Sequence, residues 1–202
     1  MDQGQQLALS GASGSGKTTL LNLIAGILQP DEGQVELDGQ SMSGGDEANR
    51  DRLRAKLLGY IFQTFNLLQG YTCVENVLLG MSFGGSPDHA RAAALLDRVG
   101  LSRHLNYYPR QLSTGQQQRV AVARALANQP KLVLADEPTG NLDPENAAEA
   151  LGLIRETCME NGAALLLVSH DKDVLGQFDE VHDLLEINKA SSWQSCVEEA
   201  GA

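Results

Sequence analysis

Short, nearly continuous apolar runs alternate along this chain with longer segments that have a helical pattern. The runs predict buried strands at residues 7–10, 58–63, 131–136, 164–169 and 181–187. Helices are predicted at residues 18–28, 50–56, 86–99, 116–128 and 144–161, and a small strand with a turn at residues 34–39. Apolar strands separated by helices are typical of a parallel sheet that helices cover on both faces. We therefore expect an α/β fold.

The strand pattern is interrupted in the middle of the chain, where residues 71–129 are largely helical and carry no convincing strand. With 202 residues the chain suits one domain. We expect a single domain over residues 1–202, with a core at 1–70 and 130–188, a helical subdomain at 71–129 and a loose polar tail at 189–202.

Composition narrows the possible partners. The formal net charge is -11, so nucleic acid and anionic lipid, which reward basic surfaces, are poor candidates. The three cysteines, Cys73, Cys158 and Cys196, are scattered without metal or redox spacing, as expected for reduced thiols in the cytosol. The start has no signal-peptide pattern, and the apolar runs at 20–28 and 163–168 fall short of the roughly 20 residues that span a bilayer. A membrane role would therefore require a partner.

A glycine-rich turn follows the first predicted strand and opens the first predicted helix. Residues 11–18 match the phosphate-loop pattern G-x-x-x-x-G-K-[ST]. Glycines let backbone N–H groups surround phosphate oxygens, Lys17 adds a positive charge, and the Thr18 hydroxyl suits a Mg²⁺ shell. An accidental match is the alternative, but the strand before and the helix after disfavour it. The predicted ATP-binding residues are Gly11, Ala12, Ser13, Gly14, Ser15, Gly16, Lys17, Thr18 and Thr19.

Two carboxylates end the apolar run at 131–136. Next to a phosphate loop, Asp136 is placed to anchor Mg²⁺, and Glu137 is placed to orient or deprotonate an attacking water. The alternative is an ordinary acidic turn before Pro138. Because the phosphate loop is also present, we favour the catalytic interpretation, and an alanine at Glu137 should abolish turnover.

Further motifs make the chain resemble the ABC-type ATPases. Residues 112–116 (LSTGQ) resemble the family's signature, 60–63 its Q-loop, 138–143 its D-loop segment and 169–171 its switch-histidine segment. The resemblance covers nearly the whole chain, from Gly4 to Ile187. It implies a P-loop NTPase fold, with a RecA-like parallel sheet and an inserted helical subdomain. Within the family, DEPTGNLD and the segment after the Q-loop resemble the lipoprotein-releasing and macrolide-export branch.

The resemblance also implies roles for further residues. Ser113, Gly115 and Gln116 would contact the γ-phosphate of ATP held by a second copy, in a head-to-tail homodimer. His170 would sense the γ-phosphate, and Gln63 would reach Mg²⁺ or the attacking water. The other histidines, 89, 104 and 182, lack such a context and are expected at the surface. Three apolar residues after Gln63 suit either a groove for a membrane subunit or plain core packing: Phe65, Leu67 and Leu68.

The sequence departs from the family pattern at its start and in its signature. Only residues 1–6 precede the phosphate-loop strand, and no aromatic residue occurs before Tyr60, so the usual adenine-stacking residue is missing. We expect a shortened N-terminus and weaker, less base-selective nucleotide binding. Thr114 replaces the commoner glycine of the signature, at a position that tolerates variation.

The function expected from these residues is an ATP-hydrolysing subunit of an ABC transporter. It would couple hydrolysis of ATP with Mg²⁺ to export or release of a substrate through a separate permease, on the cytoplasmic face of the membrane. ABC ATPases of DNA repair or translation are disfavoured, because they carry a long coiled coil or two cassettes. A regulator that acts through a membrane partner without transport and a truncated paralogue with weak activity remain alternatives.

Overall fold

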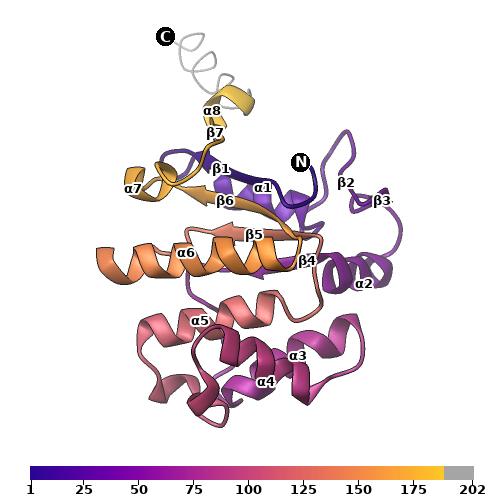
Figure 1. The fold of residues 1–202 in the computed structure, drawn as a ribbon. Coiled ribbons are helices and arrows are strands. Elements are labelled where there is room, and N and C mark those ends of the chain that lie inside the picture. Colours follow the sequence, from indigo (N-terminus) through magenta and orange to yellow (C-terminus); the bar gives the residue numbers. More distant parts are fainter. Residues whose placement is uncertain (189–202) are drawn as a thin grey trace.

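A parallel sheet of five strands forms the centre of the computed structural model, which describes residues 1–188 (Figure 1). The strand order is β4-β5-β6-β1-β7, with every neighbouring pair parallel. Its strands are β1 (Gln6–Ser10), β4 (Leu58–Ile61), β5 (Leu132–Asp136), β6 (Ala164–Ser169) and β7 (Val181–Asp183). The carboxyl ends of parallel strands lie at one edge, so β1, β5 and β6 all lead into the same region. The predicted α/β fold is confirmed.

Side chains that alternate along the strands enter two separate apolar cores. Leu165 and Leu167 of β6 pack in one core, whereas Leu166 and Val168 pack in the other. Strands buried on both faces read as continuous apolar runs, which is why these segments were predictable. Cys158 lies in the first core, where burial raises its thiol pKa to about 12. That thiol therefore stays protonated at neutral pH.

The two faces are covered by different helices. Helix α1 (Lys17–Ile24) packs on the face of Leu166, and α6 (Pro144–Glu160) packs on the opposite face. Helix α6 starts as predicted, because the Asp143 side chain accepts a hydrogen bond from Asn146 N and Pro144 occupies the first turn. Helix α1 ends at Ile24, earlier than predicted, because Gly26 adopts φ +65° and turns the chain out of the helix. The Gly26 backbone packs closely against Met42 O, since a Cβ there would lie 2.5 Å from this oxygen.

Between residues 71 and 129 the described chain forms helices only. They gather beside β4 at one end of the sheet (Figure 1). They are α3 (Cys73–Gly84), α4 (His89–Arg98) and α5 (Thr114–Ala125), with 3-10 turns at Ser102–His104 and Pro109–Gln111. Two predicted starts were wrong. Helix α4 begins at His89 because Asp88 caps it, and α5 begins at Thr114 because Ser113 and Gln116 form a reciprocal capping box.

Glycines allow α3, α5 and β4 to pack closely at one point. A Cβ on Gly59 of β4 would lie 2.4 Å from Ala125 O at the end of α5. A Cβ on Gly84 of α3 would lie 2.5 Å from the side-chain amide of Asn128, which follows α5, and 2.6 Å from the backbone oxygen of Ala55. Neither site tolerates a side chain, so the carboxyl-terminal end of α5 rests directly on its neighbours.

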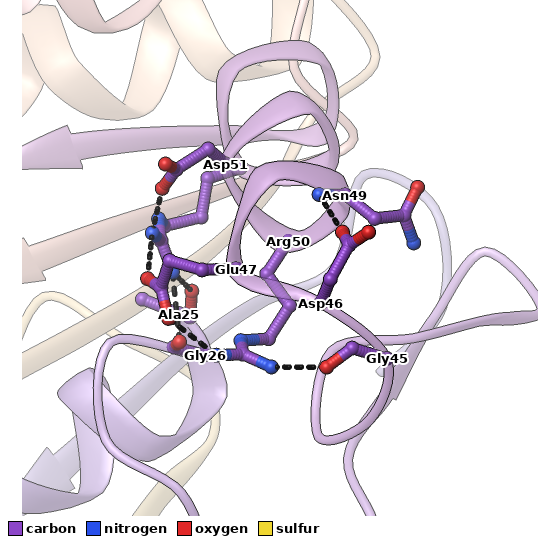
Figure 2. Close-up of polar contacts among 9 residues, drawn as sticks. Ala25, Gly26, Gly45, Asp46, Glu47, Asn49, Arg50 and Asp51 are labelled. Carbon is purple, nitrogen blue, oxygen red and sulfur yellow. Dashed lines mark hydrogen bonds and ion pairs between the residues drawn. The ribbon is translucent and has the colours of Figure 1, made fainter.

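Helix α2 (Glu47–Leu57) joins the small hairpin of β2 (Glu36–Leu37) and β3 (Gln40–Ser41) to the sheet. Figure 2 shows its first turn, where Asp46 accepts from Asn49 N and Arg50 donates to Gly45 O. Arg54 reaches the end of α1 and donates to Gly26 O at 2.7 Å. This arginine ties α2 to the carbonyl groups that end α1.

The carboxyl-terminal part differs from its predicted strand at 181–187. Strand β7 stops at Asp183, whose side chain accepts from Leu185 N and starts the short helix α8 (Leu184–Ile187). A short helix α7 (Lys172–Leu175) precedes it. No helix within residues 1–188 is long and apolar enough to cross a membrane. The tail predicted at 189–202 lies outside the described residues.

Candidate active site

The glycine-rich turn between β1 and α1 encloses the lysine that follows it. Lys17 Nζ donates to Gly11 O at 2.7 Å and to Ala12 O at 3.0 Å. Gly16 caps α1 with φ +96°, a conformation that favours glycine. At Gly11 a Cβ would lie 2.5 Å from Ser15 Oγ, so a larger residue there would force the Ser15 hydroxyl to move. The turn therefore holds a buried ammonium group against its own carbonyl oxygens.

Glu137 lies opposite this lysine and is held on several sides. Its Oε1 pairs with Lys17 Nζ at 3.3 Å and lies 2.7 Å from His170 Nδ1, and its Oε2 accepts from Ser169 Oγ at 3.2 Å. The carboxylate is 10% exposed, whereas the His170 side chain is 64% exposed. Glu137 also has φ +45°, which is uncommon for a residue other than glycine. Such strain is typical of residues held for a function.

Asp136 completes the acidic pair at the end of β5. Burial raises the pKa of its carboxyl group, the hydrogen bond from the Thr18 hydroxyl lowers it, and the charge of Glu137 raises it further. Two buried carboxylates beside one lysine leave excess negative charge, which a cation would offset. Carboxylate and hydroxyl oxygens are ligands that Mg²⁺ prefers, so Asp136 and Thr18 fit this ion.

These groups line one cavity of about 320 Å³. Of the predicted residues it contains Ser13, Gly14, Gly16, Lys17, Thr18, Thr19, Gln63, Asp136, Glu137 and His170. Gly14 has φ +80° and open space at its Cβ position, so its backbone can approach a ligand closely. The cavity combines a glycine-rich turn with its lysine, a hydroxyl beside a carboxylate, and a second carboxylate, the kinds of group that phosphate transfer to water requires.

Six predicted residues do not line this cavity: Gly11, Ala12 and Ser15 belong to the glycine-rich turn itself, and the other three lie on α5. Ser113, Gly115 and Gln116 lie at the amino-terminal end of α5, where Ser113 N and Gln116 Oε1 complete the capping box at 3.0 Å. His104 was expected at the surface, which is wrong. It is half-buried, contacts Tyr107 edge-on, and its Nε2 lies 3.4 Å from Gln116 Nε2. His89 and His182 are exposed.

Sequence reasoning missed three residues that organise the site. Ser169 binds Glu137, Asn141 Nδ2 donates to Gln63 O at 2.7 Å, and Gln118 Nε2 donates to Pro138 O. For Ser169 the sequence did contain an indication, since a polar residue at the end of a buried strand suggests a role at the edge of the sheet. For Asn141 and Gln118 the partners come from distant segments, and no local pattern indicates them.

Comparisons with known proteins agree with this geometry. The family model described as "ABC transporter" matches residues 1–140. The lipoprotein-releasing system ATP-binding protein LolD of Pseudomonas fluorescens is 44% identical over 186 residues, which are 91% of this chain and 82% of that protein. The macrolide export ATP-binding/permease protein MacB of Syntrophobacter fumaroxidans is 47% identical over 176 residues, which are 85% of this chain and 25% of that protein.

A solved structure gives the same result in three dimensions. The dimeric structure of the bacterial ABC transporter cassette MJ0796 superposes with a TM-score of 0.81 at 36% identity, and covers 91% of this chain and 82% of that one. A post-hydrolysis dimer of the same cassette, bound to ADP and Pi, matches equally well. The chain therefore belongs to the ABC transporter family, as an ATP-binding cassette that hydrolyses ATP.

Proposed function

We propose that two copies of this chain bind ATP with Mg²⁺ between them and drive a separate membrane permease that exports or releases a substrate. The observation that carries this proposal is the cavity in which Lys17, Asp136, Glu137 and His170 meet. The names of the relatives, lipoprotein release and macrolide export, support the export direction.

In this proposal each residue of the cavity has one task. The backbone N–H groups of residues 11–16 and Lys17 Nζ bind the phosphate oxygens of ATP, and hold the charge that grows during transfer. Glu137 accepts a proton from the water that attacks the γ-phosphorus in line with the departing ADP oxygen. His170 and Ser169 keep that carboxylate oriented, at the 2.7 and 3.2 Å seen here. Gln63, held by Asn141, orients the water.

Mg²⁺ would be held by Thr18 and Asp136, with Gln63 nearby, and it would neutralise phosphate charge. We predict that Thr18→Val, which keeps the shape but removes the hydroxyl ligand, raises the Mg²⁺ concentration for half-maximal phosphate release about tenfold, as when a ligand is lost. Phosphate release titrated with Mg²⁺ measures this, with Thr64→Val, an exposed threonine outside the cavity, as the control. An unchanged Mg²⁺ requirement would remove Thr18 from the metal site.

The second copy is expected to complete the site. Ser113, Gly115 and Gln116 lie outside the cavity of their own chain, and Ser113 exposes a hydroxyl at the amino-terminal end of α5. Helix amino-terminal ends attract anions. A head-to-tail homodimer would place this end of α5 over the γ-phosphate held by the other copy. The similar cassette MJ0796 was solved as a dimer, which supports the arrangement.

We further propose that residues 1–70 and 130–188 act as the core and residues 71–129 as a helical subdomain, with the permease contacting both. A groove of about 350 Å³ lies where β4 meets α3 and α5. Its apolar lining includes Leu58, Tyr60, Phe62, Leu68, Leu79 and Phe83. Phe83 is 70% exposed and Leu68 42%, and the rings of Tyr60 and Phe62 stack at 4.1 Å.

Exposed apolar groups of this size are typical of a protein-binding groove. Of the three apolar residues left open by the sequence, Phe65 and Leu67 are buried in the core, and Leu68 lines the groove. Phe62, which lines the groove, directly precedes Gln63, which lines the ATP cavity. An apolar segment of a permease would therefore lie beside the ATP cavity, with the cassette on the cytoplasmic face of the membrane.

We predict that Phe83→Asp abolishes co-purification of the permease with this chain, because it places a charge in the groove, but leaves phosphate release by the chain alone unchanged. Detergent extracts of membranes holding both subunits provide the measurement. Met159→Asp is the matched control, since Met159 is 64% exposed on α6, outside the groove. Equal recovery with both variants would exclude the groove.

A further inference from the structure

One polar side chain is completely buried in the middle of helix α5. Gln118 is 0% exposed, and Val120 and Ala121, two and three residues further along the helix, are buried and apolar. A buried amide is costly unless it is hydrogen-bonded, so its contacts indicate why it is there.

The Gln118 amide is bonded on one side only. Its Nε2 donates to Pro138 O, which lies 20 residues further along the chain, whereas its Oε1 has no partner among the described residues. Rotating the amide would turn Oε1 towards the Pro138 oxygen, and two acceptors repel each other. The neighbour therefore permits one orientation, in which Gln118 serves as a donor to Pro138.

Pro138 directly follows Glu137, and the turn there does not supply its carbonyl with a partner. Gly140 N binds Glu137 O at 3.1 Å, and Leu142 N binds Thr139 O at 3.0 Å. Within the described chain, the donor that reaches Pro138 O is Gln118. The turn after the catalytic strand is thus held from α5.

Glu137 is in this way fixed between two elements. On the side of β6, its N–H donates to Val168 O at 3.0 Å, and its carboxylate is bound by Ser169 and His170. On the other side, the peptide that follows it is held by Gln118. Because Glu137 itself has φ +45°, its backbone needs such support to keep this conformation.

We propose that Gln118 is a positioning residue for Glu137, through which helix α5 and its signature end control the geometry of the water-activating carboxylate. This rests on the proposed function, since it takes Glu137 as the base. A shift of α5 moves Gln118, the Pro138 carbonyl follows, and the Glu137 carboxylate turns with it. When the second copy closes over Ser113, the resulting shift of α5 would change the orientation of Glu137 in the same chain.

The test uses Gln118→Met in the chain of residues 1–202, because methionine fills the same space without a donor. We expect kcat for phosphate release to fall about tenfold while the KM for ATP stays within about twofold, as for an interaction made in the transition state. Thr157→Val is the control: Thr157 is 1% exposed, and its hydroxyl bonds only to carbonyls of its own helix, Leu153 O and Ile154 O. This control should lower stability and leave kcat unchanged.

A double-variant cycle separates positioning from a general structural effect. If Gln118 acts through Glu137, adding Gln118→Met to Glu137→Gln changes the residual single-turnover rate by less than about twofold. The proposal would be overturned if the effects of Gln118→Met and Glu137→Gln multiplied in the double variant. It would also be overturned if Gln118→Met left kcat unchanged, or raised the KM for ATP by as much as it lowered kcat. Should the methionine variant not fold, Gln118→Asn, which keeps the amide but is too short to reach Pro138, takes its place with the same expectations. A wild-type chain without phosphate release would instead refute the proposed function itself.

Discussion

Glu137→Gln is expected to lower phosphate release by at least about 100-fold, because general-base catalysis contributes factors of about 10² to 10⁴. The glutamine keeps the shape of the side chain and can still contact Ser169 and His170, but it no longer accepts a proton. ATP binding should persist or strengthen, since Lys17 loses the carboxylate at 3.3 Å that competes with phosphate for its ammonium group. Phosphate release and equilibrium binding of ATP, measured on the same preparation, check both halves.

The matched control for this variant is Glu32→Gln, at an exposed residue on the loop before β2. It removes one negative charge, as the test variant does, but Glu32 does not line the cavity, so the turnover rate should stay unchanged. If Glu137→Gln retained more than a tenth of the wild-type rate, Glu137 would not be the base. If Glu137→Gln abolished ATP binding instead, the role of Glu137 would be to shape the phosphate loop.

Mixing two inactive variants should restore activity, which is the second large effect. Lys17→Ala removes the phosphate-binding ammonium, and Ser113→Arg blocks the signature end of α5. In a head-to-tail heterodimer, one site carries both defects, and the other combines an intact turn with an intact Ser113. With random pairing about half of the dimers are mixed, each with one working site, so about a quarter of the wild-type rate returns.

The control mixture combines Lys17→Ala with Glu137→Gln. Both residues lie in the same cavity, so every mixed dimer has a defect in each site and no activity should return. Phosphate release as a function of mixing ratio gives the measurement, with a maximum near equal amounts. Absence of recovery in the first mixture, with both proteins folded, would contradict the head-to-tail arrangement.

Most of the sheet could be predicted from the sequence, because its strands are buried on both faces. Strand β6 has the predicted bounds, and the start of α6 follows from Asp143 and Pro144. The second half of the strand predicted at 181–187 was wrong, since Leu184, Leu185 and Ile187 suit a strand as well as a helix. There Asp183 decided the outcome by capping Leu185 N. The S-x-x-Q capping box at 113–116 was a readable signal for the true start of α5.

The cavity residues were predicted for a different reason. The phosphate turn and the Asp136-Glu137 pair each follow a strand of one parallel sheet, and such strands end at the same edge. What could not be predicted is how the carboxylate is held. The hydrogen bonds of Gln118 to Pro138 and of Asn141 to Gln63 join residues 20 and 78 positions apart, and depend on how distant segments pack together.

The contact between Gly59 and the Ala125 backbone gives α5 a fixed point at its carboxyl-terminal end, about which the helix can tilt. Because Gly59 has no side chain, the backbones of β4 and Ala125 are in direct contact, with no flexible side chain between them. From that contact to the Ser113 end, α5 extends for 12 residues, or about 18 Å at 1.5 Å per residue. A tilt of about 10° there swings the far tip by about 3 Å, comparable to a hydrogen-bond length, and moves the midpoint by roughly half as much. A tilt of α5 would thus displace the Ser113 end the most, and residues near the middle of the helix about half as far.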